Sequence, residues 1–276
     1  MKRLSIFLVL GLLFGLVTLN SCQKDDTQQA TSDDAVAAAI SADAATSDGL
    51  TVATDEATTA KDDTESSCYT VEKDIDWVNR VGTIVITFNG ECADSVYRSG
   101  TMTIVWDLGW RFDPEGKSLT ITYDNFVRND KIFNGTISMS LSVDTTDSVP
   151  VITAVYNNFS IQFDDSTSFV LSGTKYIKYV NFFDADRSNN ELVINSEMQG
   201  TSREGYNFTS VGEDITVKFS CESRFPVSGT KTINVENGDT YLIDFGDGTC
   251  DKIYTVTVNG VTTTYDWDTV SGRADN

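Results

Sequence analysis

The run DFGDGTCD at positions 244–251 is the part of this sequence whose residue types and spacing most resemble a chemical site. Asp244, Asp247 and Asp251 fall around a glycine-rich corner, where their carboxylates could offer oxygens to a calcium ion. Calcium takes roughly six to eight oxygen ligands, so three acids give only part of a site. The alternative interpretation is a hairpin corner in which the glycines allow a tight turn.

A second acidic run, FFDADRSNNE, offers another set of oxygen ligands: Asp184, Asp186, Asn190 and Glu191. The run does not follow the EF-hand pattern, because glycine is missing from the sixth place and an acid from the twelfth. Solvated acidic loops are also expected in any chain this acidic. Calcium is therefore the only cofactor for which the sequence offers candidate ligands.

The chain contains no histidine. This excludes Ser-His-Asp and Cys-His nucleophilic systems and any zinc site that uses histidine. A mechanism that uses two carboxylates remains open, but the sequence singles out no pair. We therefore assign no catalytic residue and expect a protein that is not an enzyme.

Five cysteines are present. Cys22 belongs to the N-terminal signal described below, and the remaining four are Cys68, Cys92, Cys221 and Cys250. Four cysteines in an exported chain suggest disulfides and allow three pairings. We favour Cys68–Cys92 and Cys221–Cys250, because each pair brackets one strand-rich segment. A zinc site with four cysteines would need close C-x-x-C pairs, which this sequence lacks.

An exposed aromatic ring could stack on a sugar, and Trp110 is the candidate for such glycan stacking. It follows Trp106 by four residues and lies close to the turn predicted at Asp113-Pro114. Trp106 falls on the apolar register of its predicted strand, which favours packing in the core. Filling of the core or of a sheet edge is the alternative for Trp110 as well.

The N-terminus predicts export and lipidation. Lys2 and Arg3 precede the apolar run SIFLVLGLLFGLVTL, and Leu19-Asn20-Ser21-Cys22 follows. A basic tip, a short apolar core and a small residue before the cut are typical of a signal peptide, here residues 1–21. The apolar run is shorter than the roughly 20 residues that a membrane-spanning helix needs. Cys22 directly after Ser21 makes the segment resemble a bacterial lipoprotein signal, in which this cysteine carries the lipid.

The formal net charge is −21, and removal of Lys2 and Arg3 with the signal would take it to −23. Such a chain repels nucleic acid, because binding of phosphate needs clustered lysine and arginine. Residues 22–67 are rich in alanine, threonine, serine and aspartate and contain no aromatic residue. This composition predicts an acidic low-complexity tether.

From Cys68 onward the sequence alternates apolar and polar residues with a period of two. The clearest case is Ile137, Met139, Leu141 and Val143, which are separated by serines. This period, with many threonine, valine and aromatic residues, predicts β-strands on residues 68–270. We expect one all-β domain, built as an antiparallel meander or sandwich of many hairpins.

Four Asn-Gly pairs, which begin at Asn89, Asn134, Asn237 and Asn259, predict tight hairpin turns. The segments at 83–97 and 240–254 resemble each other, each with a strand, a glycine turn, a cysteine and a second strand. They predict related hairpin units at the two ends of the domain.

Two resemblances to known families rest on these residues. DFGDGT at 244–249 is similar to the signature turn of immunoglobulin-like domains of the polycystic-kidney-disease type, although the tryptophan usual before it is missing. The signal, the acidic tether and the β-rich body with IDFGDGTCD together resemble a group of uncharacterised lipoproteins of Bacteroidota, and this resemblance implies no specific activity. The second resemblance implies a lipid anchor and an all-β fold.

The sequence therefore predicts a membrane-anchored lipoprotein of the cell envelope, in the outer membrane on its periplasmic or cell-surface face. Its partners would be the membrane, through the lipid, and an envelope protein or glycan. We expect a non-catalytic binding or structural module. A surface lipoprotein that binds or processes carbohydrate is the alternative.

Overall fold

The computed structural model describes residues 65–66, 69–91, 97–108, 116–128, 131–163, 166–181, 186–221 and 225–267. Its regular structure in these ranges is β, apart from one turn of 3-10 helix, η1 (Arg187–Asn189). The predicted all-β fold is confirmed. No helix in the described ranges is long and apolar enough to span a bilayer.

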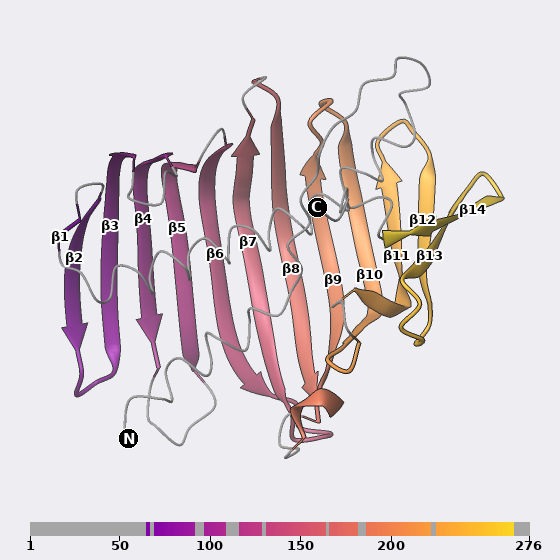
Figure 1. Ribbon diagram of the computed structural model, residues 1–276, viewed down its shortest axis with the longest axis horizontal. Coiled ribbons are helices and arrows are strands. Elements are labelled where there is room, and N and C mark those ends of the chain that lie inside the picture. Colours follow the sequence, from indigo (N-terminus) through magenta and orange to yellow (C-terminus); the bar gives the residue numbers. More distant parts are fainter. Residues whose placement is uncertain are drawn as a thin grey trace.

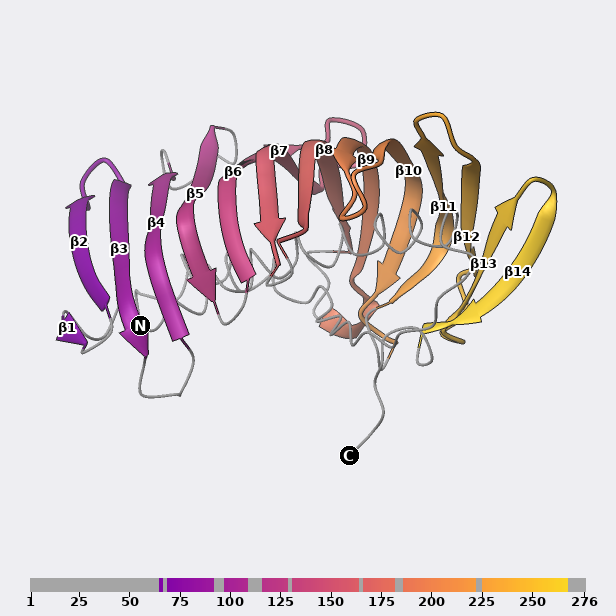
Figure 2. The same ribbon diagram turned by 90° about the horizontal axis from the view of Figure 1, so that it is seen from above.

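Within the described ranges, fourteen strands form a single antiparallel sheet, and their order in space is their order along the chain (Figure 1). The predicted meander is therefore confirmed. The first seven strands are β1 (Glu65–Ser66), β2 (Tyr69–Asp76), β3 (Val81–Glu91), β4 (Tyr97–Asp107), β5 (Lys117–Arg128), β6 (Lys131–Val143) and β7 (Pro150–Gln162). The other seven are β8 (Ser168–Val180), β9 (Glu191–Thr201), β10 (Asn207–Lys218), β11 (Pro226–Val235), β12 (Thr240–Asp247), β13 (Ile253–Val258) and β14 (Val261–Asp266). Seen from above, the sheet bends into an arch (Figure 2).

The two faces of the sheet differ in chemistry because alternate residues of a strand point to opposite sides. Ile137 and Met139 of β6 are buried, whereas Ser138 is half-buried and Ser140 is exposed. The same alternation holds on the neighbouring strands. We call the face that carries Ile137 the inner face and the face that carries Ser138 the outer face.

A cluster of aromatic rings holds the inner face together across β2 to β7. Tyr69 meets Phe88 with ring centroids 5.8 Å apart, and Phe88 meets Phe126 at 5.2 Å. The contacts continue through Tyr123 to Phe159 at 5.8 Å. Such pairs contribute about 0.5–1.5 kcal/mol each beyond their buried area. Burial also raises the pKa of the Tyr123 phenol, so this residue stays protonated.

Two of the four predicted Asn-Gly turns are confirmed. Asn259 and Gly260 have φ of 51° and 77° and join β13 to β14 in a two-residue hairpin. Asn237 and Gly238 lie in the turn between β11 and β12, where Gly238 N–H donates to Val235 O over 3.0 Å. Local sequence decides these turns, because the tight hairpin geometry needs positive φ.

The turns predicted at Asn89-Gly90 and Asn134-Gly135 are wrong, since both pairs lie inside strands β3 and β6. Gly135 is next to a break in the register between β6 and β7, where Asn158 forms a bulge with φ of 47°. The Asn134 side chain is used by another strand: its Oδ1 accepts a hydrogen bond from Asn125 N–H over 2.8 Å. The Asn134-Gly135 pair therefore serves bulges on the two neighbouring strands rather than a turn.

Candidate functional site

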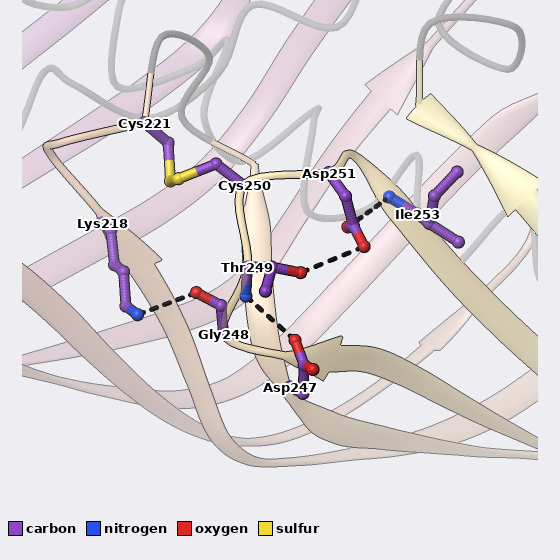
Figure 3. The surroundings of a disulfide bond; sticks show 8 residues. All are labelled: Lys218, Cys221, Asp247, Gly248, Thr249, Cys250, Asp251 and Ile253. Atoms are coloured by element: carbon purple, nitrogen blue, oxygen red, sulfur yellow. Dashed lines mark hydrogen bonds between the residues drawn. A yellow bond between two sulfur atoms is a disulfide. The ribbon is translucent and has the colours of Figure 1, made fainter.

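The acidic corner at 244–251 lies where β12 ends and the chain turns toward β13 (Figure 3). A disulfide between Cys221 and Cys250 fastens this corner to the end of β10 and its following turn, with 5.5 Å between the two Cα atoms. This is one of the two disulfides predicted from the sequence. The bond joins residues 29 positions apart and spans β11 and β12.

The carboxylates of the corner are hydrogen-bonded to their own turn. Asp247 Oδ1 accepts from Thr249 N–H over 3.1 Å, and Asp244 Oδ1 accepts from Gly246 N–H over 2.9 Å. Asp251 Oδ1 accepts from Ile253 N–H over 3.1 Å. Each acid thus closes a local turn of the Asx type, which is the structural use of aspartate at such positions.

Hydrogen bonding also sets the electrostatics of the corner. The backbone N–H of Thr249, followed by its side chain, lowers the pKa of the Asp247 carboxyl. Asp251 Oδ2 accepts from the Thr249 hydroxyl over 3.1 Å. The corner is therefore held in one shape by its own polar groups.

Lys218 is a residue of this corner that the sequence did not point to. Its Nζ donates to the Gly248 carbonyl over 2.8 Å, from the end of β10 (Figure 3). Gly248 N–H in turn donates to Val227 O over 2.7 Å. The corner is thus bound to β10 and β11 by polar contacts as well as by the disulfide. No sequence pattern relates Lys218 to Gly248, because they lie 30 residues apart.

The second acidic run does not join the first. Asp184 lies outside the described residues, and Asp186 is exposed at the start of η1. Asp186 Oδ1 accepts from Ser188 N–H over 3.0 Å and from its hydroxyl over 2.7 Å, as a helix N-cap does. Within the described ranges, no three acidic, cysteine or histidine side chains come together in a way that could hold a metal ion.

The other predicted site residues lie outside the described residues: Cys22, Cys68, Cys92 and Trp110. Lipidation, the Cys68–Cys92 bond and stacking on Trp110 therefore stay predictions. Trp106 is half-buried and packs against the inner-face core, as its register predicted.

The outer face of β4 to β7 forms a surface that the sequence analysis did not single out as a site. It carries small hydroxyl, amide and valine side chains, and we call it the hydroxyl face. Its members are Thr101, Thr103, Val105, Ser118, Thr120, Thr122, Thr136, Ser138, Ser140, Thr153, Val155 and Asn157. None of them is charged, although the chain contains 41 acidic residues.

Strand register arranges these side chains in rows that cross the sheet. Thr103 lies beside Thr122, which lies beside Thr136. The hydroxyls of Thr122 and Thr136 are 3.3 Å apart, as are those of Thr120 and Ser138. Neighbouring strands are roughly 4.8 Å apart, and alternate residues along a strand roughly 6.8 Å apart. The hydroxyl face is therefore a two-dimensional array of short polar groups.

Tyr176 of β8 is 48% exposed on the same side of the sheet, where it lies next to Thr153. Beyond it, Lys178 Nζ contacts Asp144 Oδ2 at 3.1 Å. An aromatic ring beside an uncharged array of hydroxyls can contact a neutral, hydroxyl-rich ligand by stacking and hydrogen bonding. An alternation of threonine with apolar residues was the only sequence signal for this surface.

The fold and these surfaces define a single-sheet antiparallel β protein with one apolar face, one hydroxyl-bearing face and a disulfide-linked corner. The sequence matches no protein-family model, and the searches of curated proteins and of solved structures also gave no match.

Proposed function

We propose that this chain is an exported lipoprotein of the cell envelope, anchored through Cys22, whose β-sheet is a non-catalytic binding or structural module. The signal pattern that ends at Ser21-Cys22 supports the anchor. The Cys221–Cys250 disulfide supports an oxidising compartment, because such bonds persist mainly in exported proteins.

The observation that carries the proposed binding role is the uncharged hydroxyl face in a chain of net charge −21. Asp107 and Asp124 lie in the two outermost rows of this face, beside Ser118 and Thr101, and no acidic residue lies in the two rows between them. The acids of the 244–251 corner are engaged in their own turn. A broad sheet face that contacts a partner therefore fits the molecule better than a reacting centre does.

The anchor is tested by comparing the full-length chain with its Cys22→Ser variant, with Cys221→Ser as the control for losing a cysteine elsewhere. We expect the parent chain and Cys221→Ser in the outer-membrane fraction, and Cys22→Ser in the soluble fraction after cell disruption. Mass spectrometry of the N-terminal peptide should show acyl chains on Cys22. Equal membrane association of all three forms, with no acylated peptide, would refute the lipoprotein proposal.

A second candidate function is binding of a neutral glycan, which the hydroxyl face and the exposed Tyr176 ring favour. The test is a thermal-shift screen of the full chain against neutral and acidic polysaccharides, since a ligand that binds only the folded state raises the melting temperature. We expect a rise with a neutral glycan that Tyr176→Ala or Thr122→Lys abolishes. Val211→Lys, at an exposed position of β10 outside the hydroxyl face, is the matched control and should keep the rise. A flat screen rejects this candidate.

A further inference from the structure

The two edges of the sheet are protected very differently. At one end, β2 carries Glu72, Lys73, Asp74 and Asp76, and β1 covers its first residues through Tyr69 and Thr70. At the other end, β14 reads VTTTYD, with no charge before Asp266 and no proline. Among the described residues no strand lies beyond β14. Charges and short covering strands keep an edge from pairing with another chain, whereas Val261–Tyr265 of β14 has no charge and, among the described residues, no covering strand.

From this contrast we propose that β14 is an interface at which two copies of this chain join their sheets, strand against strand, around a two-fold axis at Thr263. The occupant is a second copy because the exposed sequence of β14 complements itself in an antiparallel register, both in its backbone groups and in its side chains.

The tight turn at Asn259-Gly260 fixes which backbone groups of β14 point outward. In a two-residue hairpin the flanking pair, here Val258 and Val261, exchanges hydrogen bonds, and the pattern then alternates along the strands. Thr263 is therefore bonded to Val256 of β13. The N–H and C=O groups of Thr262 and Thr264 point to the open side of the strand.

A two-fold axis at Thr263 pairs these outward groups with each other. Thr262 of one copy then faces Thr264 of the second copy, and both positions have the outward N–H and C=O groups that a hydrogen-bonded antiparallel pair requires. Thr263 faces its own counterpart in a non-hydrogen-bonded pair. A shift of one residue would pair an outward group with an inward one. A shift of two residues would keep the hydrogen bonds, but it would place Asp266 against Thr262, or Val261 against Thr263, in place of the valine–tyrosine and threonine–threonine pairs.

The side chains match in the same register. Thr262 and Thr264 lie on one face of β14, where opposed threonines form a favourable cross-strand pair. On the other face, Val261 of one copy lies against Tyr265 of the second copy. Val261 is 65% exposed in the single chain, and the Tyr265 ring already stacks on Tyr254 at 5.4 Å. Pairing covers an exposed valine with an aromatic surface.

Sedimentation velocity of the full chain with Cys22→Ser, which removes any lipid, tests the proposal over a range of micromolar concentrations. We expect a monomer–dimer equilibrium. Thr264→Pro removes one outward N–H without touching a bond to β13, so this variant should be monomeric. Thr264→Val keeps the N–H and should still dimerise. Thermal melting of each variant establishes that it is folded.

Cysteine cross-linking tests the register independently of the proline variant. A non-hydrogen-bonded pair places Cα atoms about 4.5 Å apart, within the range of a disulfide. Thr263→Cys should therefore form an intermolecular disulfide under oxidation at least about tenfold more efficiently than Thr262→Cys, whose counterparts are offset along the strand. A chain that stays monomeric at all concentrations overturns the proposal. So does a dimer that survives Thr264→Pro, or equal cross-linking by the two cysteines.

Discussion

The centre of the sheet and the acidic corner at 244–251 each contain a glycine with positive φ that follows an asparagine or an aspartate. The two glycines differ in what surrounds them. Gly135 in β6 has φ of 101° and follows an asparagine, and Gly248 has φ of 96° and follows an aspartate. A Cβ added to Gly135 would lie 2.7 Å from the Cα of Phe159 and closer still to the Asn158 carbonyl oxygen. At Gly248 the near atom is only the flexible end of Lys218, at 3.2 Å.

Hydrogen bonds show the same difference. At the centre, the N–H of the bulged residue Asn158 donates to the Ser172 hydroxyl over 3.0 Å, 14 residues away on the next strand. At the corner, the N–H groups of Thr249 and Ile253 donate to carboxylates two residues away. The central strands therefore depend on each other, whereas the corner is shaped locally and then fastened by Cys221–Cys250. Four experiments with substituted variants test this distinction.

The largest effect is expected from Gly135→Ala. The variant should lose about 4 kcal/mol of unfolding free energy, because positive φ strain adds to a clash with the neighbouring backbone. Gly248→Ala should lose about 1 kcal/mol, since only the strain remains. Urea unfolding of both variants measures the difference. Equal losses would show that the close approach of β7 to Gly135 is not a constraint.

Removal of the disulfide should have the next largest effect. The double variant Cys221→Ala, Cys250→Ala should lose about 3 kcal/mol of unfolding free energy. This is the loss expected when a disulfide between cysteines 29 residues apart no longer restricts the unfolded chain. Hydrogen exchange by local opening should accelerate most in β12 and β13, beyond the uniform increase that a lower global stability gives to β5 to β7. An equal acceleration across the whole sheet would contradict the local role that we assign to the corner.

A smaller loss is expected from Ser172→Ala. This change removes the hydroxyl that accepts from Asn158 N–H, and the cost should be about 1 kcal/mol in urea unfolding. Ser140→Ala, at an exposed position on the outer face of β6, is the matched control and should cost no more than about 0.5 kcal/mol. Identical stabilities for the two variants would mean that the hydrogen bond from Asn158 N–H to the Ser172 hydroxyl does not stabilise the bulge at Asn158.

The smallest effects concern two carboxylates at strand ends, Asp247 at the end of β12 and Asp144 directly after β6. Hydrogen bonding, first from the Thr249 backbone, lowers the pKa of Asp247, and hydrogen bonding from the Thr146 backbone and Lys178 lowers that of Asp144 between β6 and β7. A lowered folded-state pKa stabilises the fold above the ordinary aspartate pKa, and this contribution disappears as pH falls through the folded value. Carboxyl titration by NMR should show that Lys178→Met raises the pKa of Asp144 and leaves that of Asp247 unchanged. A rise at both sites would contradict local control.

The sequence was a reliable guide wherever a feature depends on neighbouring residues. The period of two in β6 predicted which side chains are buried, and Asn259-Gly260 predicted a tight hairpin. Trp106 packs against the inner-face core, on the side of β4 that its place in the alternation predicted. Cys221–Cys250 was the preferred pairing on similar grounds, because the two cysteines bracket consecutive strands.

Where contacts between strands decide, the same signals misled. Asn134-Gly135 has the local chemistry of a turn, yet it continues a strand because bulges at Asn125 and Asn158 need its amide oxygen and its missing Cβ. The acids at 244–251 were predicted as weak candidates for metal ligands, and in the structure each accepts a hydrogen bond from its own turn. Lys218 carried no signal at all.

By itself, then, the sequence determined the class of fold, the alternation of buried and exposed residues in strands such as β6, and two of the turns, because periodicity and turn chemistry are properties of neighbouring residues. It also favoured the pairing of Cys221 with Cys250. Tertiary structure alone decided that all the described strands form one sheet, which threonines align across β4 to β7 and which edge is unprotected. These features depend on the register between strands, and register follows from bulges and packing contacts between residues far apart in the chain.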